Sequence, residues 1–255
     1  ILVLNCSKEE TENKTSLNSF ELTPTEIKVF LRETTTLTIS SGNGSYRINQ
    51  SPESKEIVEI SLANENQNVL VKALKSGTTT ASITDILSKT EITISIQAII
   101  PPSYYTLSED KKTLVKWNDT QEESIDLSSD PILKEITSVG EGAFKGNQTL
   151  KTITLPEKIT FLGKESFSGV SKLESITLPN SITSVGEGVF AGCTALKEVT
   201  LPKNDTFTAI AKRTFENCKS LSTIQLPESI HEIGILAFAD AGLTTISLPE
   251  NLLEI

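Results

Sequence analysis

The sequence predicts a mostly β chain in which an N-terminal β-sandwich is followed by a solenoid of about five stacked coils. Three observations predict this. A unit of about 23 residues recurs from residue 132 onward, seven short runs of alternating apolar residues precede it, and the pair Pro101-Pro102 lies between the two regions as a stiff junction. A fixed period is the signature of a solenoid, and short alternating strands separated by turn residues are typical of a sandwich.

Five phenylalanines mark the repeat. They are separated by 23, 23, 25 and 23 residues, and each is followed by a segment of the form L-x-x-[IV]-x-L-P: Phe144, Phe167, Phe190, Phe215 and Phe238. One such coil cannot bury its apolar side alone, so neighbouring coils must stack. We expect the phenylalanines to fill the interior of the stack.

Within each repeat the L-x-x-[IV]-x-L-P segment is expected to form a short strand. Side chains alternate along a strand, so Ile153 and Leu155 point inward and their neighbours point outward. We call the ten outward positions the strand face: Thr152, Thr154, Ser175, Thr177, Glu198, Thr200, Thr223, Gln225, Thr245 and Ser247. A second apolar pair follows the proline, with glycine directly after it at Gly140, Gly163, Gly186 and Gly234, and with Ala211 in the fourth repeat.

The repeat resembles a known family. The segment 182–202, ITSVGEGVFAGCTALKEVTLP, is similar to the BspA-type leucine-rich repeat of bacterial surface proteins, and the resemblance covers residues 132–255, about half of the chain. It implies adhesion to an extracellular host or neighbouring-cell protein or glycan. Residues 101–131 resemble the linker and N-terminal cap of such arrays. Trp117 is expected to close the first coil, although stacking on a ligand is the alternative role for its ring.

The apolar runs of the first region predict seven strands: Ile27/Val29/Leu31, Leu37/Ile39, Tyr46/Ile48, Val58/Ile60/Leu62, Val69/Val71/Ala73, Ala81/Ile83 and Ile92/Ile94/Ile96. Turn clusters at 41–44 and 76–78 separate them. The segments 22–27, 44–48, 71–80 and 90–96 resemble a group 2 bacterial immunoglobulin-like domain, which would span residues 18–100. In related surface proteins such a domain spaces or presents the part that binds.

The amino terminus, residues 1–17, resembles the end of a bacterial lipoprotein signal followed by a polar tether. Cys6 is the expected lipidation site, and a plain cysteine in a tail is the alternative. The sequence has no methionine, so we expect it to start partway through its leader. This resemblance implies an outer-membrane lipoprotein on the bacterial cell surface, anchored to the membrane by lipid.

Composition excludes some functions. The net charge is −10, so the chain lacks the basic patch that nucleic acid binding requires. Cys193 and Cys218 occupy the same place in consecutive repeats; buried thiols are the expected state, with a disulfide as the alternative. His231, the only histidine, is expected on the surface. No cofactor motif, metal-spaced cluster or catalytic arrangement is present in the sequence, so we expect no cofactor, no metal and no enzymatic activity.

The predicted function is therefore non-enzymatic, adhesin-like binding by a monomer, through the strand face. Thr and Ser ladders also stabilise a sheet that has no ligand, which is the alternative for these positions. The 25-residue interval places an insertion near residues 205–208, where Asp205 and Phe207 are further candidates, Phe207 as core or as exposed anchor. A structural spacer or assembly module, associating through the end at 248–255, is the alternative function. An enzyme would need paired carboxylates beside a groove, and the strand face carries only Glu198.

Overall fold

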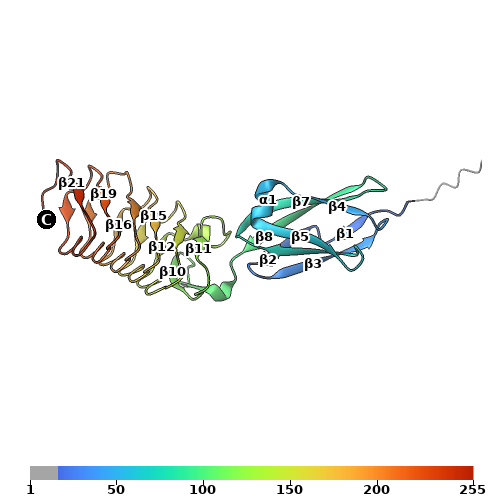
Figure 1. Ribbon diagram of the computed structural model, residues 1–255, viewed down its shortest axis with the longest axis horizontal. Helices are drawn as coiled ribbons and strands as arrows, with labels where there is room; N and C mark the ends of the chain where they lie inside the picture. The colour runs from blue at the N-terminus through green and yellow to red at the C-terminus, as the bar shows by residue number, and fades with distance from the viewer. Residues whose placement is uncertain (1–16, 255) are drawn as a thin grey trace, which may run out of the picture.

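The structure is a computed structural model that describes residues 17–254. Two β-rich parts lie end to end along the long axis of the molecule, with β1 to β8 in the first and β9 to β21 in the second (Figure 1). The only α-helix among these residues is α1 (Pro52–Ile57), and no helix there is long and apolar enough to cross a membrane. The mostly β prediction is confirmed.

The first part consists of two four-stranded sheets. In spatial order, one sheet contains β1 (Glu21–Thr23), β3 (Thr34–Ser41), β6 (Asn68–Ala73) and β5 (Val58–Ala63). The other contains β2 (Glu26–Phe30), β8 (Glu91–Ile99), β7 (Gly77–Asp85) and β4 (Tyr46–Asn49). All neighbours are antiparallel except β2 and β8, which are parallel.

Each of the seven predicted apolar runs falls on a strand of these sheets, although Leu31 lies one residue beyond the end of β2. Inward side chains such as Leu37, Val71 and Ile94 are fully buried, which follows from the alternation of the sequence. Strand β1 was not predicted, because three residues are too short to show alternation. Helix α1 was also missed. It begins at Pro52 after Ser51, whose hydroxyl accepts a hydrogen bond from the Ser54 N–H at 3.1 Å.

The second part winds as a solenoid with two ladders of parallel strands. The first ladder comprises β10 (Thr113–Trp117), β12 (Ser138–Val139), β14 (Phe161–Leu162) and β16 (Ser184–Val185), and is continued by the pair β18 (Ala209–Ile210) and β20 (Glu232–Ile233). At its N-terminal edge β9 (Tyr105–Leu107) pairs antiparallel with β10. The second comprises β11 (Ser124–Asp126), β13 (Thr152–Thr154), β15 (Ser175–Thr177) and β17 (Glu198–Thr200), and is continued by β19 (Thr223–Gln225) and β21 (Thr245–Ser247). Two 3-10 turns, Pro102–Tyr104 and Leu133–Glu135, complete this part.

A column of aromatic rings runs through the solenoid core. Phe144, Phe167, Phe190 and Phe215 are at most 2% exposed, and the stack that they form with Phe238 has ring centroids 4.9 to 5.7 Å apart. The column extends beyond the phenylalanines, since Trp117 stacks on Phe144 at 5.7 Å and Tyr105 on Trp117 at 6.4 Å. Trp117 was expected to close the end of the first coil, but it lies inside the column, and Tyr105 stacks beyond it. The alternative of ligand stacking is wrong, because its ring is 6% exposed and lies between two others.

Within residues 17–254 the two cysteines, Cys193 and Cys218, are buried and free. The Cys193 thiol donates to the Phe167 carbonyl and the Cys218 thiol to the Phe190 carbonyl, both at 3.2 Å. Burial raises the pKa of both thiols, that of Cys218 to about 12. The prediction of buried thiols is confirmed, and the structure contains no disulfide between them.

Ser166 has a buried hydroxyl without a hydrogen-bond partner among the described residues. The same place, directly before the phenylalanine, holds Ala143 and Ala237 in other coils. We expect Ser166→Ala to raise the free energy of unfolding by about 1 kcal/mol, because it removes an unpaired polar group. Thr214→Val should lower it by about 1 kcal/mol, since the Thr214 hydroxyl donates to the Ala211 carbonyl. Urea denaturation measures both, and an equal loss in the two variants would contradict this account.

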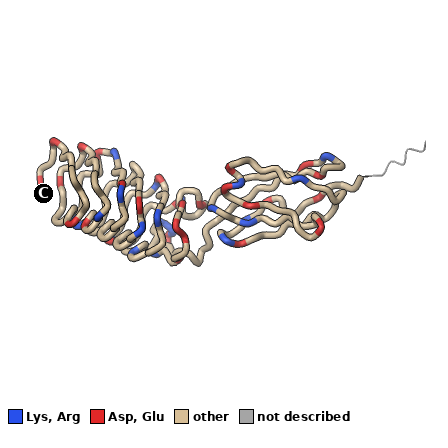
Figure 2. The backbone as a smooth tube through the Cα atoms, in the orientation of Figure 1, with Lys and Arg blue, Asp and Glu red and all other residues tan. Residues whose placement is uncertain are grey.

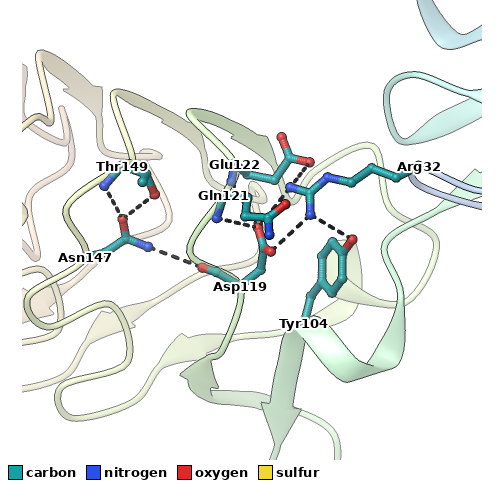
Figure 3. A network of polar contacts seen from close by, with 7 residues as sticks. All are labelled: Arg32, Tyr104, Asp119, Gln121, Glu122, Asn147 and Thr149. Carbon is teal, nitrogen blue, oxygen red and sulfur yellow. Dashed lines mark hydrogen bonds and ion pairs between the residues drawn. The ribbon is translucent and has the colours of Figure 1, made fainter.

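The junction between the two parts is built around Arg32, in the turn after β2 (Figure 3). Its guanidinium donates to both carboxylate oxygens of Asp119 at 3.2 and 3.3 Å, to Glu122 at 2.7 Å and to the Tyr104 hydroxyl at 3.0 Å. It also lies over the Tyr104 ring, 5.1 Å from its centroid. Nearby, the Ile100 N–H donates to the buried carboxylate of Asp130 at 2.8 Å. These directional contacts fix the orientation of the first part relative to the solenoid.

Candidate functional site

The strand face lies on the outer surface of the second ladder. All ten of its predicted side chains are exposed, while the residues between them, such as Ile153, Ile176 and Val199, are at most 8% exposed, with Ile246 in the last strand as the exception. The alternation of the sequence therefore predicted this surface. At the N-terminal end of the ladder the Thr152 hydroxyl donates to the Ser124 hydroxyl at 2.8 Å. That contact agrees with a stabilising role for part of the face.

The strand face is interrupted between β17 and β19. At every other step of this ladder, the residue before the strand donates its N–H to its counterpart in the preceding coil. These bonds join Lys151 to Glu123, Glu174 to Lys151, Lys197 to Glu174 and Thr244 to Ser222, at 2.7 to 3.0 Å. The equivalent bond from Ser222 to Lys197 is absent from the described residues, and β17 and β19 are not paired. The Lys197 carbonyl is thus left without its usual donor.

The interruption crosses the first ladder as well, but it does not reach the phenylalanine side. Gly140, Gly163, Gly186 and Gly234 each donate an N–H to the preceding coil, whereas within residues 17–254 Ala211 makes no such bond to Val185. Between the same two coils, the Gly188 N–H donates to Lys212 at 2.9 Å and the Phe190 N–H donates to Thr214 at 2.9 Å. These two coils are therefore joined by backbone hydrogen bonds on the phenylalanine side and lack the usual backbone hydrogen bonds in both ladders.

The insertion in the fourth repeat accounts for the opening. The side chain of Asn204 holds the inserted loop. Its Oδ1 accepts hydrogen bonds from the Thr206 and Phe207 N–H groups at 2.8 Å, and its Nδ2 donates to the Asn180 and Ile182 backbone carbonyls at 2.7 and 2.8 Å. Phe207 is 1% exposed and takes the core place that isoleucine has in other coils. The larger ring needs more room than isoleucine, which agrees with the greater separation of the two coils.

The opening forms a groove of about 680 Å³ between β17 and β19. Its exposed walls come from the strand face and from the loops after the two strands: Lys197, Glu198, Thr200, Lys203, Asp205, Thr223, Gln225 and Glu228. Its floor is apolar and includes Val199, Leu201, Ile224 and Leu226. A concave site of this size with an apolar floor and several convergent polar groups is typical of a binding site.

Charged residues of both signs are interspersed along both parts of the chain (Figure 2). Several lysines bridge to an acidic side chain in a neighbouring coil: Lys151 to Glu123, Lys158 to Glu135, Lys197 to Glu174 and Lys212 to Glu187. Because these pairs are exposed, each contributes little to stability. The pair with Glu174 does occupy the ammonium of Lys197, a residue that lines the groove.

The structure brings together five of the predicted site residues. Glu198, Thr200, Thr223 and Gln225 from the strand face meet Asp205 of the insertion at the groove. Of the two roles that the sequence left open for Phe207, its buried ring agrees with the core and not with an exposed anchor. Cys6 lies outside the described residues. His231 is exposed, as predicted.

Lys203 and Glu228 also line the groove and were not predicted. Both follow the proline at the end of a strand, a place that the sequence assigned to a turn. The alignment of Phe207-x-x-Ile210 with Ile182-x-x-Val185 could have shown that two residues are inserted directly after Pro202. Within residues 17–254, no group of three or more His, Cys, Asp or Glu side chains could hold a metal ion.

The sequence of the repeats identifies the family. Residues 121–207 and 204–255 match the BspA type leucine rich repeat region in six copies. The chain belongs to this family. The match begins before the repeats predicted at 132–255, because β11 already pairs in register with β13, Ile125 opposite Ile153. The segment 101–131, predicted as linker and cap, therefore carries repeat sequence at its end.

Several solved structures are similar to part of this chain. The T. pallidum leucine rich repeat protein TpLRR is 25% identical over 61% of this chain and 80% of that chain, with a TM-score of 0.53. The pneumococcal vaccine antigen PcpA is 21% identical over 62% of this chain and 38% of that chain, with a TM-score of 0.46. A leucine rich cell surface protein from Faecalibacterium prausnitzii is 24% identical, covering 56% and 52%, with a TM-score of 0.38. No curated protein matches the chain.

Proposed function

We propose that this BspA-type repeat chain is a non-enzymatic cell-surface binding protein whose strand face, centred on the groove between β17 and β19, recognises an extracellular protein or glycan. The observation that supports this most is the groove itself. It interrupts an otherwise regular ladder, and it gathers exposed polar side chains from two coils and an inserted loop. Ladders that only stabilise a solenoid have no need of such an interruption.

The side chains at the groove are free to bond to a ligand. Those of Glu198, Thr200, Thr223 and Gln225 have no hydrogen-bond partner among the residues that the structure describes, and the same holds for the rest of the strand face outside the pair of Thr152 and Ser124. Polar groups that are already exposed and unpaired can bond to a ligand without first breaking a bond within the protein. This favours recognition over a purely stabilising role at these four positions.

The rest of the chain fits presentation of that face. We propose that residues 18–100 form a group 2 bacterial immunoglobulin-like domain that spaces the repeats of 132–255 from the membrane, with 101–131 between them. The Arg32 network supports this, since a fixed junction holds the solenoid at one angle. We also propose that Cys6, in the segment 1–17, carries the lipid anchor of an outer-membrane lipoprotein. The sequence around that cysteine is its support.

A charge reversal on the face tests the binding function. We expect the double variant Glu198→Lys and Gln225→Lys to reduce adhesion to an array of matrix proteins and glycans by about tenfold or more, because both changes place a cation in the groove. The matched control is Thr183→Lys with Glu232→Lys, which makes the same change of charge at exposed positions of the other ladder. Surface plasmon resonance on the proteins or glycans that the array retains measures both.

Unchanged adhesion in the groove variant would remove the strand face as the binding surface. Failure of the unmodified chain to bind any member of the array would favour the structural spacer or assembly module. Light scattering at several concentrations separates those two alternatives, because an assembly module must associate as its concentration rises while a spacer stays monomeric.

A further inference from the structure

The charges that remain free at the groove are mostly negative. Glu198, Asp205 and Glu228 line it, are exposed and take part in no ion pair of the described chain. Lys197 is paired with Glu174 at 3.1 Å, so Lys203 is the one lysine at the groove whose ammonium is free of an ion pair within residues 17–254. Three carboxylates thus face a single free ammonium, an arrangement that attracts a cation.

The opened backbone adds a further acceptor. In the other coils the carbonyl at the place of Lys197 accepts an N–H from the next coil, and here that donor is missing. A carbonyl and several carboxylates offered from two coils match a group with several N–H donors in a fixed plane. The guanidinium of arginine is such a group, and an ammonium satisfies fewer of these acceptors.

The lining argues against a sugar as the occupant. Its described side chains include no aromatic ring, because Phe207, the nearest candidate in the sequence, is buried in the core. A sugar ring would therefore find no flat apolar surface on which to stack its own apolar face. Carboxylates and an unpaired carbonyl are better partners for a positive side chain that an extended segment carries into the groove.

We propose that the groove between β17 and β19 binds an extended protein segment through one basic side chain, preferably arginine. The guanidinium enters between the two strands, where the carboxylates of Glu198, Asp205 and Glu228 attract its charge and its N–H groups donate to the acceptor nearest to it. The flanking residues of the segment extend along the strand face. This inference rests on the proposed binding function and specifies the partner as a basic protein segment.

Fluorescence anisotropy with labelled heptapeptides tests the proposal on the whole chain. The probe is Gly-Ser-Thr-Arg-Thr-Ser-Gly, compared with the same peptide carrying citrulline or glutamate in place of arginine. We expect the arginine peptide to bind about tenfold or more tightly than the citrulline peptide, because charge-assisted hydrogen bonds are lost in citrulline. The glutamate peptide should show no binding, and the affinity for arginine should fall as salt is added.

Two variants provide a matched pair. Glu228→Gln removes a carboxylate from the groove and should weaken binding of the arginine peptide by about threefold to tenfold. Glu157→Gln makes the same change at the same place of an intact coil, after Pro156, and should leave the affinity unchanged. Equal effects of the two variants, equal affinity for arginine and citrulline peptides, or no binding of the arginine peptide at millimolar concentration would each overturn the proposal.

The adhesion experiment distinguishes failure of this inference from failure of the proposed function. If the chain adheres to array members through the strand face but does not discriminate between the peptides, the binding function stands and the basic-segment assignment is wrong. If retention on the array is confined to glycans and is lost with Glu198→Lys, the groove is a sugar site, and the assignment is again overturned. Preferential retention of proteins rich in arginine supports it.

Discussion

Replacing Phe190 with alanine is expected to lower the free energy of unfolding of the solenoid by about 4 kcal/mol. Phe190 is fully buried and stacks on Phe167 at 5.7 Å and on Phe215 at 5.6 Å. The substitution removes apolar area from the core and leaves a cavity that neighbouring rings cannot fill, since each is held by its own coil. It also removes two ring contacts at once.

Guanidinium chloride denaturation followed by circular dichroism measures this loss. Phe161→Ala is the control, because Phe161 is also in the solenoid but 41% of its side chain is exposed; we expect a loss below about 1 kcal/mol. Phe238, at the partly buried end of the stack, should give an intermediate value. A loss for Phe190→Ala no larger than that for Phe161→Ala would contradict the aromatic column as the main source of stability.

Replacing Gly186 with alanine is expected to lower the free energy of unfolding by about 3 kcal/mol, because the new methyl group would meet backbone. A Cβ at this position would lie 2.5 Å from the Lys164 nitrogen, 2.8 Å from its Cα and 2.9 Å from the Gly163 carbonyl carbon. No rotation of a side chain relieves such contacts, so the two coils must separate. That separation breaks the bond from the Gly186 N–H to the Leu162 carbonyl, which is 2.8 Å long.

Ala211 supplies the control for this prediction. It occupies the same column in the fourth repeat, where the ladders between β16 and β18 are already open, so its methyl group has the space that the other coils lack. Ala211→Gly should therefore cost only about 1 kcal/mol, the entropy that glycine adds to the unfolded chain. Gly140→Ala should fall between the two, since its nearest contact would be 3.1 Å. Equal losses of unfolding free energy in Gly186→Ala and Ala211→Gly would refute the steric explanation for glycine at this place of the repeat.

The sequence predicted several of the residues that line the groove, but it did not predict the shape of the groove. Alternation placed Glu198, Thr200, Thr223 and Gln225 on the outer surface, and the irregular interval marked Asp205 as part of an insertion. The burial of Phe207 was left open, because a ring in a loop and a ring in a core column look alike until the insertion is positioned. Glu228 was missed because nothing in its own repeat distinguishes it from Glu157.

The sequence by itself determined the features that each repeat needs in order to stack: the aromatic column, the inward aliphatic residues, the exposed strand face, the small residues around Cys193 and Cys218, and the glycines of the ladder. These follow from local periodicity, because every coil must present the same apolar surface to its neighbours. Only the tertiary structure decided where the stack opens and what lies there. The opening between two coils depends on the inserted loop, on the buried ring of Phe207 and on the bonds of Asn204, which join residues from different coils. The Arg32 junction likewise depends on how two separately folded parts meet, which no repeat encodes.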